Sequence, residues 1–133
     1  MEIKIIKYTK QIAEQEGYPN VKIKFLKLYT SGKKMTNGTC SNHKNRINFN
    51  RLFLFLLEHR KHCGDYRSEV WETMLHEIAH LNKDTEISKP YKLGDLRKEE
   101  YINWTHTLTF WIYLRRLRKK YLPLKKQFME VLS

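Results

Sequence analysis

The segment DYRSEVWETMLHEIAHL, residues 65–81, constrains the fold of this chain more than any other stretch. Its apolar residues recur at helical spacing around most of a helix circumference: Val70, Trp71, Met74, Leu75, Ile78 and Leu81. That pattern predicts a central, largely buried helix, with Asp65 or Ser68 as N-cap. A polar stripe with two histidines remains, and burying it without a partner would be costly.

His76, Glu77 and His80 in this helix form the pattern HExxH. Residues four apart on a helix lie one above the other, so both imidazoles can point at one metal ion. A catalytic zinc ion takes three protein ligands and keeps one position for water, whose proton a nearby glutamate can accept. The pattern therefore predicts one Zn²⁺ per chain with Glu77 as general base. The alternative is a polar helix face without metal.

The remainder of the chain predicts a small α+β domain covering residues 1–133. An N-terminal helix over 2–16 ends at Gly17, and alternation in VKIKFLKLYT indicates a strand with one buried face. MTNGTCS and KNRINFN add two short strands, giving an antiparallel or mixed sheet, and RLFLFLLEHR favours a helix. A long helix is expected from Leu96 to about Tyr121, ended by Pro123 and followed by a short tail. The spacing of Trp104, Phe110, Trp111 and Tyr113 predicts core packing.

Apolar run lengths and cysteine spacing indicate the cellular compartment. The longest apolar run, LFLFLL, is too short to span a bilayer, and the N-terminus lacks a signal-peptide core. We therefore expect a cytoplasmic protein without a membrane partner. Cys40 and Cys63 show no CxxC spacing and are expected to be reduced, structural thiols. The sequence does not predict an oligomeric state.

The chain is strongly basic, with 26 Lys and Arg against 14 Asp and Glu and a net charge of +12. Such a balance favours polyanionic partners, DNA among them. Within the basic C-terminal segment, at about 115–133, the candidate nucleic-acid contacts are Arg115, Arg116, Arg118, Lys119 and Lys120. The alternative is a solvated helix end whose cations complement the helix dipole.

The third zinc ligand must come from downstream, where the candidates are Asp84, Glu86, Asp95, Glu99, Glu100 and His106. The segment KEEYINWTHTL is favoured because Glu99 and Asn103 lie four apart, so that one can bind metal while the other supports a histidine. Glu100 is the second choice, since it shares a helix face with Trp104. His106, the one histidine downstream of the motif, would lie deep in the expected long helix.

The spacing His76-Glu77-x-x-His80-x18-Glu99 resembles the gluzincin branch of the zincin metallopeptidases, over residues 68–104. The resemblance implies His76, His80 and Glu99 as zinc ligands, Glu77 as general base and Asn103 as support for a ligand. Residues 38–55, ahead of the motif, are also similar to the minimal SprT-type zincins. Their third ligand is usually a histidine, often next to a glycine, and this chain has no matching His-Gly pair, so that kinship is taken as architectural.

The resemblance also implies how a substrate would bind. In zincins a peptide pairs with the exposed strand nearest the motif helix, here RINFN or NGTCS. A tyrosine or histidine often steadies the oxyanion, and the candidates are Tyr91, Tyr101 and His106.

The expected function is zinc-dependent hydrolysis of peptide bonds in a peptide or protein substrate, with DNA-associated proteins as one substrate class. One alternative is a non-catalytic nucleic-acid-binding protein with a structural metal or none. Another is a latent peptidase whose basic C-terminal tail covers the cleft.

Overall fold

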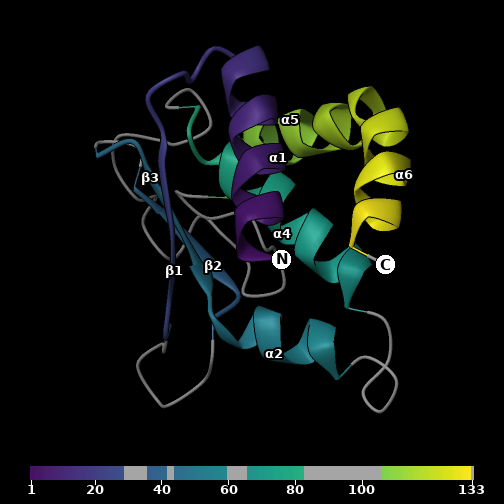
Figure 1. The fold of residues 1–133 in the computed structure, drawn as a ribbon. Helices are drawn as coiled ribbons and strands as arrows, with labels where there is room; N and C mark the ends of the chain where they lie inside the picture. The colour runs from purple at the N-terminus through teal and green to yellow at the C-terminus, as the bar shows by residue number, and fades with distance from the viewer. Residues whose placement is uncertain (29–35, 42–43, 60–65, 83–105, 133) are drawn as a thin grey trace, which may run out of the picture.

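Helix α1, Glu2–Gln15, begins the chain in a computed structural model that describes residues 1–28, 36–41, 44–59, 66–82 and 106–132 (Figure 1). Its buried residues recur every three or four positions and form one stripe: Ile5, Tyr8, Thr9, Ile12 and Ala13. Thr9 satisfies its buried hydroxyl by donating to the Ile5 carbonyl at 2.7 Å. Gly17 follows the helix with φ of 95°, a left-handed conformation that favours glycine. The predicted first helix and its glycine stop are confirmed.

Three short strands form a mixed sheet in the order β1-β3-β2. β1, Lys22–Leu26, pairs parallel with β3, Arg46–Asn50, and β2, Gly38–Ser41, pairs antiparallel with β3. Exposed and buried residues alternate along β1, which confirms the one-sided strand predicted there. The strand RINFN is therefore central, and NGTCS contains β2, which is an outer strand of the described sheet, as is β1.

Helix α2, Leu52–Glu58, confirms the helical interpretation of the apolar run that follows β3. The motif helix α4 spans Arg67–Ala79, and eight of its 13 residues are buried, as predicted. The prediction of Ser68 as N-cap is wrong, because Tyr66 precedes the first turn and its carbonyl accepts from the Val70 amide. Asp65, the other predicted cap, lies outside the described residues.

The C-terminal region differs from the expected single helix ending at Pro123. Helix α5 spans Leu108–Lys120, and the Thr107 hydroxyl caps it by accepting from the Phe110 amide at 3.2 Å. A second helix, α6, follows at Leu122–Val131. Pro123 stands at its start, where a missing amide hydrogen costs nothing, so the proline opens a helix. The expected short tail is wrong, and residues 96–105 of the expected helix lie outside the described part.

Helices α1 and α4 lie between the sheet on one side and α5 and α6 on the other (Figure 1). Trp71 of α4 and Tyr8 of α1 both pack on Phe128 of α6, with ring centroids 5.1 and 5.4 Å apart. The motif helix thus runs through the core, and the α+β fold class is confirmed. In the described part of the chain, no helix combines the length and apolarity that crossing a membrane requires.

Candidate metal centre

Three histidine side chains converge at the C-terminal end of α4. The Nε2 atoms of His76 and His80 are 3.2 Å apart, and that of His106 lies 3.2 Å from the first and 3.1 Å from the second. His76 and His80 come from successive turns of one helix, whereas His106 stands 26 residues further along. The HExxH spacing predicted the first two positions, and the fold adds the third.

The cap of α5 brings His106 to this place. Thr107 caps the helix, so His106 lies in a bend one residue ahead of the cap, and the expectation that it lies deep in a helix is wrong. Phe110, in the first turn of α5, is fully buried and anchors that turn against α4. A threonine immediately before the first apolar residue of the helix, Leu108, was the available sequence signal for this helix start.

The three nitrogens cannot all satisfy one another by hydrogen bonds. Each Nε2 of a neutral imidazole is either a donor or an acceptor, and three atoms with two states leave at least one mismatched pair. A metal ion resolves this conflict because it accepts the lone pairs of all three. Zinc binds imidazole nitrogen at about 2.0–2.1 Å, which places tetrahedral ligand atoms ~3.3 Å apart. The observed 3.1–3.2 Å separations are close to that value.

The electrostatic environment keeps the imidazoles in the form that binds metal. Burial, followed by the nearby His106, lowers the pKa of His76 to about 4. Burial, followed by the other two histidines, lowers the pKa of His80 to about 3, and burial also lowers that of His106. The three rings are therefore neutral at pH 7, as a metal ligand must be.

Two aromatic side chains pack against the histidine rings. The Phe110 ring lies 4.4, 4.9 and 5.0 Å, centroid to centroid, from those of His80, His106 and His76. Trp111 stacks on His106, with a centroid distance of 5.9 Å and an interplanar angle of 29°. Phe110 is buried, and Trp111 and Tyr113 are partly buried, in line with the predicted core packing. Phe110 and Trp111 also contact the histidine rings. Trp104 lies outside the described residues.

Glu77 is next to the histidines and is almost wholly buried, with 5% of its surface exposed. Burial raises the pKa of this carboxyl to about 8. Its Oε2 atom is buried and has no hydrogen-bond partner among the described residues, which is unusual for a native carboxyl group. A carboxyl group with such an oxygen beside three imidazole nitrogens could accept a proton from a water molecule held between them.

A groove runs between β2 and α4 past these residues. It consists of two adjoining hollows of about 250 and 370 Å³, and both are lined by Thr36, Gly38, His76 and Glu77. The larger hollow is also lined by His80, His106 and Cys40. The three histidines and Glu77 therefore line a groove whose other wall is β2.

Five further residues predicted for the site lie outside the described residues: Tyr91, Glu99, Glu100, Tyr101 and Asn103. Cys63 does so too. His106, predicted as a candidate for oxyanion support and set aside as ligand, is the described residue that joins the two motif histidines. Comparison of the chain with protein-family models, curated proteins and solved structures gave no match.

Proposed function

We propose that the protein is a zinc-dependent peptidase in which His76, His80 and His106 bind one Zn²⁺ and Glu77 is the general base. The observation that carries the proposal is the trio of nitrogens 3.1–3.2 Å apart beside a buried carboxyl oxygen without a partner. The identity of the metal rests on the ligand set, because three imidazoles with an open side match the catalytic sites that zinc occupies. Glu99, which the gluzincin resemblance implies, is the competing third ligand.

Different side chains would bind the metal, transfer the proton and orient the ligands. A bound zinc ion would supply a Lewis acid that polarises a carbonyl and lowers the pKa of a coordinated water. Glu77 takes the proton of the attacking water through Oε2 and returns it to the leaving amine. The charge of a metal ion held by the three neutral histidines would favour the ionised form of Glu77 and offset the rise in its pKa that burial causes. Phe110 and Trp111 shield the ligands and keep them oriented.

The groove suits an extended substrate. β2 is the outer strand of the described sheet, and its Gly38 and Thr39 line the hollow that holds the histidines. A peptide adding to β2 by main-chain hydrogen bonds would pass directly over Glu77. The resemblance left two strands open for this role, and the central position of β3 supports β2.

The latent form of the enzyme receives less support. Phe128 of α6 is fully buried against Trp71, and α6 contributes no residue to the lining of either hollow. Deleting the chain after Pro123, as a test of latency, would remove part of the core. A structural zinc remains the second candidate function, and a fourth protein ligand would favour it, because catalysis needs an open coordination position.

The proposal is tested with zinc-loaded protein and an unstructured protein substrate such as casein. Glu77→Gln should reduce hydrolysis by about 10²-fold or more while leaving the zinc content unchanged, because the proton acceptor is lost and the ligands are not. Glu69→Gln makes the same change at an exposed position of the same helix and should leave hydrolysis intact. Equal activity of the two variants would contradict the role of Glu77.

A further inference from the structure

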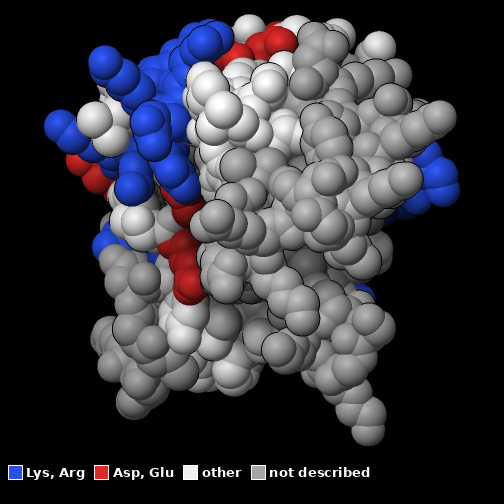
Figure 2. Space-filling view, turned by 180° about the vertical axis from the view of Figure 1, so that it is seen from behind, with Lys and Arg blue, Asp and Glu red and all other residues white. Residues whose placement is uncertain are grey.

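The basic stretch at 115–126 forms an exposed surface across two helices. Leu114, Leu117 and Tyr121 are buried and turn the opposite side of the segment outward. That side carries the cations of α5 and of the first turn of α6: Arg115, Arg116, Arg118, Lys119, Lys120, Lys125 and Lys126. Seen from behind, Figure 2 shows blue side chains gathered on one part of the molecule.

Two of these cations are neutralised within the protein. Arg118 forms an ion pair with Glu72 of α4, and Lys120 donates to Glu16 at 2.6 Å. Among the described residues, no acidic group pairs with the others, of which Arg115, Arg116 and Lys119 are exposed on α5. The dipole at the C-terminal end of α5 favours a cation at Lys119, which lies in the last turn. It does not account for the cations at Arg115 and Arg116, which lie one turn earlier. Unpaired, adjacent arginines are the groups that bind phosphate best.

This surface, defined by Arg115, Arg116, Lys119 and Lys126, adjoins the groove of the metal centre. Arg118 lies on the same helix, and its partner Glu72 lines the smaller hollow beside His76. A polymer held on the cations would therefore pass near the groove entrance.

We propose that this surface binds nucleic acid through its phosphates. A membrane is the other polyanion of comparable size, but the apolar side of α5 is committed to the core through Phe110, Leu114 and Leu117. A helix that lies in a bilayer surface must place its apolar side in the lipid. Only two large apolar side chains of α5 are exposed, Leu108 and Ile112, and they do not form such a side. The surface carries no base-reading motif, so it binds the backbone irrespective of sequence. Binding rests on charge and needs no hydrolysis, so this proposal and the peptidase proposal can fail separately.

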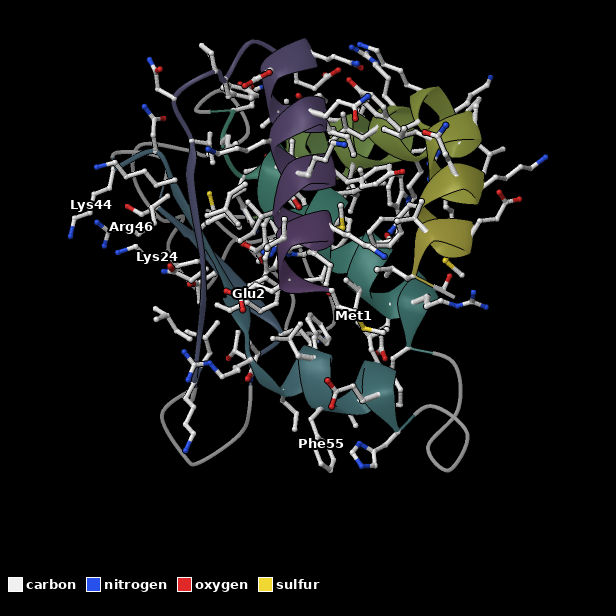
Figure 3. All side chains as sticks on the ribbon, in the orientation of Figure 1. Met1, Glu2, Lys24, Lys44, Arg46 and Phe55 are labelled. Carbon is white, nitrogen blue, oxygen red and sulfur yellow. The ribbon has the colours of Figure 1, made fainter. Side chains whose placement is uncertain are left out.

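The test is fluorescence anisotropy with a labelled 20-base-pair duplex DNA (about two helical turns) at several salt concentrations. The variant Arg115→Ala/Arg116→Ala/Lys119→Ala removes three charges from the surface without disturbing helix formation. Its control, Lys22→Thr/Lys24→Thr/Lys44→Ala, removes three charges from exposed positions near the far edge of the sheet, where Lys24 and Lys44 lie in Figure 3. Both variants have the same net charge.

We expect the α5 variant to bind about tenfold or more weakly than wild type, with a salt slope reduced by about 2 to 3, and the control to bind nearly as wild type. Glutamine at the same three positions should have the same effect, which separates charge from any change in helix stability. Equal losses in the two triple variants, or no DNA binding by the wild type at low salt, would overturn the proposal. So would binding to phosphatidylcholine vesicles with about one-quarter phosphatidylserine in the absence of DNA binding.

Discussion

Gly38 of the outer strand lies directly against Glu77 of the motif helix. A Cβ atom at position 38 would stand 3.1 Å from Cγ of Glu77, 3.1 Å from Cγ2 of Thr73 and 3.2 Å from the Asn48 carbonyl oxygen. These approaches are tighter than ordinary van der Waals contacts, so the absence of a side chain is what allows β2 to approach α4. The glycine therefore sets both the width of the groove and the position of the carboxyl group in it.

Gly38→Ala should displace the Glu77 side chain and reduce hydrolysis by about tenfold or more, because small misplacements of a catalytic group are costly. Zinc content should stay the same, since the ligands lie elsewhere. Gly17→Ala is the control: nothing lies within 4 Å of its Cβ, but its φ of 95° strains alanine. That variant should lose about 1 kcal/mol of stability and keep its activity. Full activity of Gly38→Ala would contradict the role assigned to Gly38.

Glu77→Gln should stabilise the metal-free protein at alkaline pH. The folded protein raises the pKa of Glu77 from an ordinary 4.5 to about 8, so its native carboxyl retains a proton that the unfolded chain releases. The stability of the wild type therefore falls as pH rises through this interval, whereas glutamine does not titrate. Melting temperatures in EDTA should agree at about pH 4 and diverge by pH 8, with the variant higher. A gap that stays constant across this range would show that the carboxyl is not buried in this way.

Phe110→Leu should weaken zinc binding by about tenfold or more, because this ring contacts all three imidazoles and limits their rotation. The matched control is Phe128→Leu. Phe128 is equally buried but packs on Tyr8 and Trp71, away from the site. The two variants should lose similar stability, and only the first should lose affinity in a competition titration with a zinc chelator. Similar affinities would mean that Phe110 contributes to packing alone.

Glu16 should stabilise the fold at neutral pH and not in acid. Burial raises the pKa of Glu16, but hydrogen bonds from Lys120, Tyr121 and Tyr113 together lower it by a larger amount. The net pKa therefore lies below 4.5. The stabilisation is present above the ordinary pKa and is lost as pH falls through the folded value. Glu16→Gln should therefore cost about 1–3 kcal/mol at pH 7 in urea unfolding, and the cost should shrink as the pH falls below the ordinary pKa of 4.5. Glu14→Gln, at an exposed position of the same helix, should have little effect at either pH.

The sequence predicted the parts of the fold that local pattern determines. The first helix, the alternating strand β1 and the buried motif helix all follow from apolar periodicity, and the HExxH spacing placed His76, Glu77 and His80 together. The start of α5 was predicted wrongly, because continuous apolar spacing outweighed the cap that Thr107 provides. Pro123 was assigned to a helix end because proline also suits the first turn of a new helix, and spacing does not distinguish the two.

The approach of His106 to the motif histidines could not be predicted from spacing. It depends on where α5 begins and on how α5 packs against α4, and both are properties of the tertiary structure. The same holds for Gly38, whose contact with Glu77 joins residues 39 positions apart in sequence. The cations at 115–126 were visible in the sequence, but their division into paired and unpaired members depends on the positions of Glu16 and Glu72.

The most direct test of the account is the zinc content of purified, zinc-loaded protein, measured by elemental analysis for the wild type, His106→Ala and Glu99→Ala. The account predicts one zinc per wild-type chain, its loss in His106→Ala and its retention in Glu99→Ala. Zinc retained by His106→Ala and lost by Glu99→Ala would contradict the three-histidine centre and favour the ligand set that the gluzincin resemblance implies.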